Sequence, residues 1–376
     1  MKIERKLKKT LEQFLFKGKI IIVYGPRQVG KTTLCKELIA KYGSERSYVD
    51  CEIIEKKQAL EDQNPDRLRK FLGDGKFFVL DEAQKVSDIG TSLKLLVDTY
   101  PDIQIVATGS SSFDLANKIN EPLTGRAYEF MLYPISWGEI RASFPAHEVA
   151  EKLPTMLRFG SYPKLLDLNY TEPESKLYLS SIASNYLYKD IFALETIKKP
   201  ELLLKLLQLL ALQLGGEVSF YEIATKLVTS VNTVLRYIDL LEKAFVIFRL
   251  YPLSRNLRNE IGKKTKIFFY DLGIRNALIG NTNALHLRND IGGLWENFCI
   301  IERKKKIQYD LVFLNQYFWR NRDGAEVDYV EERDGTIKGF EFKWAEGAYR
   351  KPKTFLESYH AGIDVINRNN FEDFLL

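Results

Sequence analysis

The stretch that decides the fold of this 376-residue chain is Gly25-Pro-Arg-Gln-Val-Gly30-Lys31-Thr32. It follows the β-branched run KIIIV at Lys19–Val23, which is typical of a buried central strand, and it leads into a helical pattern at Thr33–Lys41. Glycines between a strand and a helix let backbone N–H groups curl around phosphate groups at the helix N-terminus. The stretch therefore predicts a phosphate-binding loop in an α/β fold.

Two side chains of this loop suit a nucleoside triphosphate with Mg²⁺. Lys31 is placed to reach the β- and γ-phosphate oxygens, and Thr32 is placed to ligate the magnesium ion. A chance glycine turn is the alternative, and the flanking strand and helix argue against it. The residues predicted to bind ATP are Gly25, Pro26, Arg27, Gln28, Val29, Gly30, Lys31, Thr32 and Thr33.

A second apolar run, Phe77–Leu80, ends in the carboxylates of Asp81 and Glu82. In this arrangement the first carboxylate helps to hold Mg²⁺, and the second is placed to polarise the attacking water. The alternative is that Glu82 has only a structural role, as a carboxylate at the start of a helix. The pair therefore predicts the metal ligand and the catalytic carboxylate of an ATPase.

A third run, Ile103–Ala107, ends in Thr108-Gly109-Ser110. The hydroxyl groups of Thr108 and Ser110 are predicted to orient the water or to sense the γ-phosphate, and simple turn chemistry is the alternative. Three strand ends with phosphate-directed groups indicate an open parallel sheet whose ligand lies at the carboxyl edge.

This arrangement resembles the AAA+ superfamily of ATPases. The resemblance implies a helix, an arginine and a fifth strand after the hydroxyl-bearing strand, and Phe113–Ile119, Arg126 and Ala127–Leu132 fit that order. An arginine at this position acts on the nucleotide of a neighbouring subunit, where it neutralises transition-state charge. The resemblance thus implies a homo-oligomer, such as a ring, with Arg126 as a catalytic residue in trans. The alternative is a surface arginine paired with Glu121 or Glu129.

The middle of the chain contains two segments with different patterns of apolar residues. Residues 139–199 place aromatic and apolar residues at helical spacing, where an AAA+ protein has a helical lid. Residues 200–266 resemble a winged helix-turn-helix, which serves either DNA binding or protein docking. The segments that suggest it are the helical patterns Leu202–Leu214, Ser219–Leu227 and Asn232–Lys243 and the strand-like runs Phe245–Tyr251 and Ile267–Tyr270, which flank a loop with Arg255, Arg258, Lys263 and Lys264.

The net charge of +5 is concentrated in one segment. Residues 201–266 carry 10 basic and 6 acidic side chains, whereas residues 267–376 carry 15 basic and 17 acidic ones. A basic segment favours contact with nucleic-acid phosphates. DNA is therefore a predicted partner, and the acidic C-terminal third is the less suitable surface for holding it.

Composition excludes other classes of protein. Apolar residues at 45% and charged residues at 28% are ordinary globular values, which exclude wholesale disorder. No apolar stretch approaches the roughly 18 residues of a membrane span, so no membrane partner is expected. Cys35, Cys51 and Cys299 form no disulfide or metal-binding pattern, which fits a cytoplasmic location.

The candidate functional residues of the C-terminal third are mainly carboxylates. Glu296 lies at the predicted start of an amphipathic helix, and two alternating runs, Ala325–Val330 and Gly339–Trp344, are separated by the hairpin signal Asp334-Gly335. The period of two places Glu341 and Lys343 on one face of their strand. Asp328, on the partner strand, can point to the same side.

A helix glutamate, a strand aspartate and a Glu-x-Lys pair form the constellation of PD-(D/E)xK nucleases. This implies that Asp328 and Glu341 hold a divalent ion, and that Lys343 steadies the attacking water or the scissile phosphate, with Glu296 as the helix carboxylate. The alternatives are a set of strand salt bridges, or a preserved nuclease fold that binds or docks without cleavage.

The whole chain resembles prokaryotic and archaeal AAA+ ATPases that end in a DUF4143-type domain with a restriction-endonuclease-like fold. The predicted class is α/β, with an AAA+ core at 1–138, a lid at 139–199, a winged helix at 200–266 and a nuclease-like domain at 267–376. The predicted function is an ATP-hydrolysing enzyme that acts on DNA, with a C-terminal domain that cuts or binds it. The alternative is a nucleotide-controlled protein-interaction switch with an inactive nuclease fold.

Overall fold

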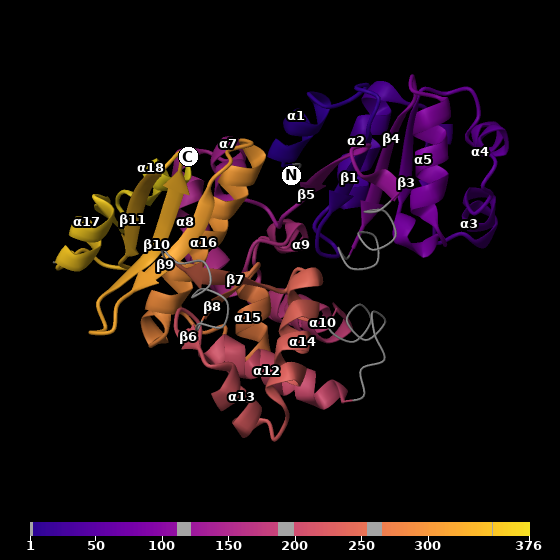
Figure 1. Cartoon of the computed structure of the whole chain (residues 1–376). Coiled ribbons are helices and arrows are strands. Elements are labelled where there is room, and N and C mark those ends of the chain that lie inside the picture. The colour runs from indigo at the N-terminus through magenta and orange to yellow at the C-terminus, as the bar shows by residue number, and fades with distance from the viewer. Residues whose placement is uncertain (1–2, 111–121, 187–198, 254–264, 348) are drawn as a thin grey trace. The chain divides into compact units, whose positions relative to one another are not determined.

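The computed structural model describes residues 3–110, 122–186, 199–253, 265–347 and 349–376 (Figure 1). The chain forms two compact units. The first comprises Met1–Ile135 together with Lys243–Phe245, and the second comprises Ser136–Glu242 and Val246–Leu376. The predicted helix Phe113–Ile119 and the four basic residues of the predicted wing loop lie outside the described residues.

The first unit is built on a five-stranded sheet in the order β2-β3-β4-β1-β5, and every pair of neighbours is parallel. β1, β3 and β4 are buried at every position, as the continuous apolar runs predicted. The strands are β1 Ile20–Tyr24, β2 Tyr48–Asp50, β3 Phe77–Asp81, β4 Gln104–Gly109 and β5 Ala127–Met131. Because β1 lies between β4 and β5, the loop after β1 emerges beside the ends of both neighbours.

In the described residues of the first unit, five α-helices accompany this sheet (Figure 1). They are α1 Lys6–Glu12, α2 Lys31–Tyr42, α3 Ile54–Leu60, α4 Pro65–Leu72 and α5 Ile89–Thr99. α2 packs against β3 and β4. It begins two residues before the predicted start, at Lys31, because Gly30 adopts a left-handed conformation with φ 98° and ends the loop there. The predicted α/β class with a parallel sheet is confirmed.

The second unit begins with the helices of the predicted lid segment: α7 Trp137–Ser143, α8 Ala146–Phe159, α9 Pro163–Asp167 and α10 Glu172–Tyr186. α8 and α10 both pack against α15, Leu272–Leu278, which belongs to the same unit. Three more helices follow in the chain: α12 Pro200–Leu212, α13 Phe220–Lys226 and α14 Val231–Lys243. None of the helices in the described residues is both long and apolar enough to cross a membrane.

A seven-stranded mixed sheet in the order β12-β11-β10-β9-β7-β8-β6 runs through the second unit. Its strands are β6 Glu217–Val218, β7 Ile247–Pro252, β8 Thr265–Phe269, β9 Asn315–Arg320, β10 Glu326–Arg333, β11 Thr336–Phe342 and β12 Gly362–Ile366. β7 pairs with β9 in parallel, so the strands of the predicted winged helix and those of the predicted nuclease-like domain share one sheet. The predicted boundary after residue 266 falls inside β8.

The hairpin signal folds as predicted. Asp334 and Gly335 have φ values of 51° and 76° and connect the paired residues Arg333 and Thr336, which is the two-residue turn that favours Asp-Gly. α16, Ile291–Tyr309, begins before the predicted start, so Glu296 lies inside the helix. Two further α-helices of the described residues follow the hairpin, α17 Lys353–Tyr359 and α18 Phe371–Leu375.

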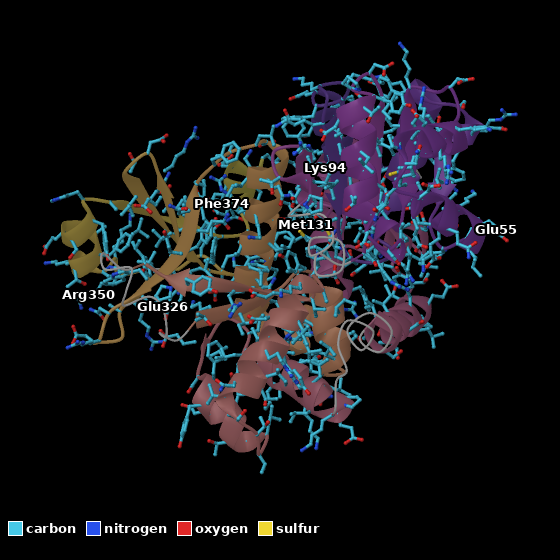
Figure 2. The ribbon with its side chains drawn as sticks, turned by 45° about the vertical axis from the view of Figure 1, so that its right-hand side comes forward. Glu55, Lys94, Met131, Glu326, Arg350 and Phe374 are labelled. Atoms are coloured by element: carbon cyan, nitrogen blue, oxygen red, sulfur yellow. The ribbon has the colours of Figure 1, made fainter. Side chains whose placement is uncertain are left out.

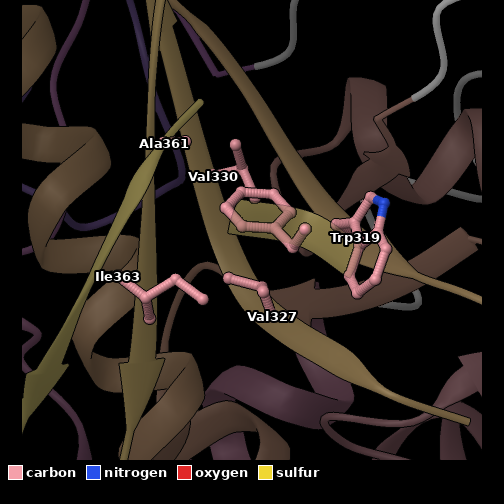
Figure 3. Close-up of a cluster of buried hydrophobic side chains, with 6 residues drawn as sticks. Trp319, Val327, Val330, Ala361 and Ile363 are labelled. Carbon is pink, nitrogen blue, oxygen red and sulfur yellow. The ribbon is translucent and has the colours of Figure 1, made fainter. Parts of the chain in front are cut away.

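Beside the hairpin, a buried apolar cluster joins the strands to α17 (Figure 3). Its members are Trp319, Val327, Val330, Phe355, Ala361 and Ile363. The rings of Trp319 and Phe355 meet edge to face, with centroids 5.3 Å apart. This packing fixes β9 and β10, and β10 carries the carboxylates of the predicted nuclease-like site.

Candidate functional site

The loop after β1 is pressed against the end of β5. A side chain at Gly25 would place its Cβ 2.3 Å from the carbonyl oxygen of Leu132, so only glycine fits this approach. The ammonium of Lys31, which is 5% exposed, donates hydrogen bonds to the carbonyl oxygens of Gly25 (2.8 Å) and Pro26 (3.0 Å). The predicted lysine is therefore held over the loop, at the N-terminus of α2.

Arg5, a residue that sequence reasoning missed, supports this loop from the position just before α1. It immediately precedes α1, is 6% exposed, and donates to the carbonyl oxygens of Val29 (2.6 Å) and Tyr133 (2.5 Å). One guanidinium therefore ties the phosphate-binding loop to the segment after β5. Nothing in the local sequence marks Arg5, because its partners lie 24 and 128 residues away.

Asp81, at the end of β3, is the centre of a buried set of oxygen groups. One carboxylate oxygen accepts hydrogen bonds from the hydroxyl groups of Thr32 (2.7 Å) and Tyr48 (2.6 Å), and the other accepts from Thr108. Burial and the bond to Asp81 raise the pKa of Tyr48, so this phenol stays protonated as a donor. The structure thus brings together the predicted Thr32, Asp81 and Thr108, and adds Tyr48.

Glu82 is held in a fixed orientation beside them. Its backbone is left-handed, with φ 54°, and its N–H group donates to the hydroxyl of Thr108 at 3.1 Å. Its carboxylate accepts from the amide of Gln84 (2.5 Å) and from the hydroxyl of Ser110 (3.1 Å), and Gln84 also donates to Ser110 at 3.1 Å. The predicted Glu82, Thr108 and Ser110 therefore form one site. Gln84 was missed, although it lies only two residues after Glu82.

Arg126 lies apart from these contacts. Its guanidinium donates to the carboxylate of Asp98 on α5 at 2.7 Å, and the two side chains are 38% and 43% exposed. The hydrogen bond to Arg126 lowers the pKa of Asp98. This partner was not considered from the sequence, and Glu121, one of the two glutamates that were, lies outside the described residues.

A second cluster forms in the other unit, around a lysine that sequence reasoning missed. Lys266 of β8 is 1% exposed, and its ammonium lies 2.7 Å from a carboxylate oxygen of Glu296 and 3.7 Å from one of Asp328. It also forms an ion pair with Glu326. The predicted Glu296 and Asp328 are therefore brought together, but with a cation of the chain between them.

The charges of this cluster depend on each other. Burial alone would lower the pKa of Lys266, but the charges of Glu296, Asp328 and Glu326 hold that pKa above its ordinary value, so the lysine is an ammonium. Burial raises the pKa of Glu296, and Lys266 opposes this rise. A buried carboxylate is costly unless a cation faces it, which makes Lys266 the counter-ion on which the cluster depends.

Glu341 and Lys343 lie on one face of β11 and its continuation, as predicted, and form an ion pair at 2.7 Å. Burial and the neighbouring Asp328 raise the pKa of Glu341. Asp328 also accepts a hydrogen bond from the backbone N–H of Phe342 at 2.9 Å, which ties β10 to β11. All four predicted residues of the nuclease-like constellation therefore lie in one neighbourhood.

Beside this neighbourhood lies a pocket of about 550 Å³, lined by Glu326, Glu341, Arg350, Lys351 and Lys353 among others. Figure 2 labels Glu326 and Arg350, an acidic and a basic residue that both line this pocket. In the part of the chain that the structure describes, no group of three or more His, Cys, Asp or Glu side chains is arranged to hold a metal ion. With Lys266 between them, the carboxylates do not fit a resident divalent ion.

A further charged network joins α15 to the residue that precedes α16. Asp290 accepts from the guanidinium groups of Arg275 (2.5 Å) and Arg288 (2.7 and 2.8 Å), which are both buried. Burial opposes the ionisation of Asp290, but the bonds to the two arginines lower its pKa to about 2. The network belongs to the packing of the second unit.

Comparison with known families divides the chain into three matched segments. Residues 17–141 match a family model described as an AAA domain, residues 150–285 match a domain of unknown function, DUF8612, and residues 291–370 match another, DUF4143. The predicted AAA domain and the predicted DUF4143 domain are confirmed by these matches.

Curated relatives and a solved structure resemble most of the chain. The uncharacterized protein Rv2008c of Mycobacterium tuberculosis is 26% identical over 336 residues, which cover 89% of this chain and 72% of the relative. The uncharacterized protein MJ1637 of Methanocaldococcus jannaschii is 27% identical over 372 residues, which cover 88% of this chain and 74% of the relative. A Walker-type ATPase of Pyrococcus abyssi matches in structure with a TM-score of 0.51 and 16% identity, over 73% of this chain and 95% of that one, which indicates a shared fold.

The loop, the strand ends and these matches agree on one assignment. The chain is a P-loop ATPase with an AAA-type domain at residues 17–141 and a DUF4143 domain at residues 291–370.

Proposed function

We propose that this ATPase hydrolyses ATP with Mg²⁺ in order to act on DNA. The observation that carries the hydrolytic part is the closed set of contacts that fixes Thr32, Asp81, Glu82, Thr108 and Ser110 at the ends of β3 and β4. A hydroxyl and a carboxylate in direct contact are oxygen donors of the kind that Mg²⁺ prefers. Thr32 and Asp81 would hold the ion, which neutralises charge on the β- and γ-phosphates.

In the proposed mechanism the chain's own groups position and polarise the water. The carboxylate of Glu82 accepts the proton of the attacking water as the oxygen of that water bonds to the γ-phosphorus, while the bond from this phosphorus to the bridging oxygen breaks and ADP leaves with the electron pair. Gln84 and Ser110 hold that carboxylate by two donated hydrogen bonds, so it needs little reorganisation when charge develops. Lys31 and the backbone N–H groups of residues 27–33 bind the phosphates.

We propose that Arg126 acts on the nucleotide of a neighbouring subunit, in a homo-oligomer. Its pair with Asp98 is exposed on both sides, and exposed ion pairs contribute only about 0–1 kcal/mol. Exchange of this carboxylate for the γ-phosphate of another subunit therefore costs little.

A cytoplasmic location is supported by Cys35, Cys51 and Cys299, which are all free and buried thiols.

The DNA part rests on the order of elements α12, β6, α13, α14, β7 and β8, in which β8 pairs with both β6 and β7. This order supports the predicted winged helix-turn-helix. α14 begins without an acidic residue in its first turn, so its positive N-terminal end favours a phosphate. The exposed residues of α13, the turn and α14 that would face DNA are Lys226, Ser230, Asn232 and Arg236.

DNA-stimulated ATP turnover tests this proposal. Turnover should rise with linear, forked or four-way DNA and the rise should shrink as salt increases, because phosphate contacts release counter-ions. The double variant Lys226→Ala/Arg236→Ala should lose the stimulation but keep basal turnover. The charge-matched control Lys70→Ala/Lys76→Ala, at exposed positions of the first unit, should keep both. No response of wild-type turnover to any DNA form would refute the proposal.

A second candidate function is favoured by one observation, the position of Lys266 among the carboxylates. It is the use of the DUF4143 domain for binding or docking, without cleavage, in a nucleotide-controlled switch. An assay of Mg²⁺- or Mn²⁺-dependent DNA cleavage distinguishes the two functions. Cleavage that Asp328→Ala abolishes, with ATP turnover intact, would support catalytic roles for Glu296, Asp328, Glu341 and Lys343, with Asp328 and Glu341 as metal ligands, and would refute the second function.

A further inference from the structure

We propose that Lys266 is a built-in cation that takes the place of a divalent metal ion in the carboxylate cluster of the second unit. The ammonium pairs with Glu296 on α16 and with Glu326 and Asp328 on β10, while Lys266 itself belongs to β8. Three carboxylates from two elements therefore converge on one nitrogen from a third. This is the pattern of ligands around an ion, except that the cation is covalently part of the chain.

The side chains of this cluster are shielded from solvent, so their charges must be balanced within the chain. The side chain of Lys266 is 1% exposed, and those of Glu296 and Asp328 are 11% and 15% exposed. An uncompensated charge in such a place costs several kcal/mol, so the ammonium stabilises carboxylates that would otherwise need an external cation. The chain supplies this cation at any metal concentration.

The ammonium also excludes a metal ion from its neighbourhood. A protonated lysine has three donors and no lone pair, so it cannot itself become a ligand. Mg²⁺ demands oxygen ligands at about 2.0–2.1 Å in an octahedron, and the carboxylate oxygens nearest the centre are already bonded to Lys266. A divalent ion would enter only by displacing an ammonium that is itself 1% exposed.

An aromatic ring provides a separate support for this ammonium. The ring of Phe318 on β9 lies with its centroid 5.6 Å from the ammonium nitrogen, within the range of a cation–π contact. Lys343, the lysine of the Glu-x-Lys pair, is in a different setting, since its side chain is 44% exposed and it pairs with Glu341. The cluster therefore has a lysine beyond the one that the sequence pattern required.

Mn²⁺ binding by the full chain, without nucleotide, tests the proposal by electron paramagnetic resonance of the free ion. Lys266→Met removes the charge and keeps an apolar stem of similar length. It should create a Mn²⁺ site that the further substitution Asp328→Asn removes again. The matched control is Lys305→Met, since Lys305 is equally buried but pairs at 2.6 Å with Glu302, which lies outside this cluster, and it should create no site that Asp328→Asn removes.

Wild-type protein provides the second arm, which does not depend on the folding of any lysine variant. It should bind no Mn²⁺ that Asp328→Asn removes, and Mn²⁺ should not raise the melting temperature reported by tryptophan fluorescence. All four tryptophans, Trp137, Trp295, Trp319 and Trp344, belong to the second unit, so this signal reports on the unit that holds the cluster. Mn²⁺ binding by wild type that depends on Asp328, or no gain of binding in folded Lys266→Met, overturns the proposal. Neither result bears on DNA-stimulated ATP turnover.

Discussion

Substitution of Arg5 by methionine separates the support of the phosphate-binding loop from the chemistry within it. Arg5 donates two hydrogen bonds to backbone carbonyl oxygens, of Val29 and Tyr133, in a buried position. Hydrogen bonds to charged groups are worth about 1.5–3 kcal/mol each, so the loss of both costs about 3 kcal/mol at the lower end. A domain with 5–15 kcal/mol of total stability remains folded after such a loss.

The effect on ATP follows from the bond to Val29 alone. If about 1.5 kcal/mol of loop order must then be supplied by the nucleotide, ATP binding weakens roughly tenfold. Titration with a fluorescent ATP analogue measures this, and hydrogen exchange of residues 25–33 should rise in the same variant. Lys9→Met, on the helix that begins directly after Arg5, at a side chain that is 73% exposed, is the control and should change neither. Arg5→Met with wild-type ATP affinity and unchanged loop exchange would refute the reasoning.

Three further predictions concern the two units. Glu82→Gln should bind ATP as wild type but lose turnover by about 10²-fold or more, measured by phosphate release, because the general base is gone while the amide can still accept its two hydrogen bonds. Arg126→Ala should be inactive alone and regain turnover when mixed with Lys31→Ala subunits; no recovery in the mixture would contradict a role in trans. Asp290→Asn should lose about 2 kcal/mol of stability in urea at pH 7, because the folded pKa of Asp290 is lowered from 3.8 to about 2. That difference should vanish as pH falls from about 4 to 2, as seen by tryptophan fluorescence, since a depressed carboxyl pKa stabilises the fold only above this window.

The nucleotide site could be predicted from the sequence because each of its parts follows a strand. The loop after β1, Asp81 and Glu82 after β3, and Thr108 and Ser110 after β4 are contiguous motifs with fixed local geometry. Parallel strands then bring their carboxyl ends to one edge without further information. The α/β class follows from the same runs, and β1, β3 and β4 each begin and end within two residues of the predicted runs.

The supporting residues could not be predicted because their partners are distant in the chain. Arg5 contacts residues 24 and 128 positions away, and Tyr48 reaches Asp81 from a three-residue strand that has no apolar run of its own. The role of Lys266 could not be predicted for a different reason. It stands in a strand that is buried throughout, where a charged residue has no reason to lie unless carboxylates from elsewhere meet it. Periodicity reports which face a residue occupies, not which distant charge it meets.

Lys266 also changes the meaning of the charge distribution along the sequence. Counted by segment, it belongs to the basic residues 201–266, yet in space its single positive charge pairs with Glu296, Glu326 and Asp328 of the acidic residues 267–376. The winged-helix segment therefore presents less positive charge to a partner than its sum suggests, and the C-terminal segment presents less negative charge. Because both corrections come from a buried group, they hold at any ionic strength, whereas the exposed charges of α13 and α14 are screened by salt. The salt dependence of DNA-stimulated turnover thus reports on Lys226 and Arg236 and not on the cluster around Lys266.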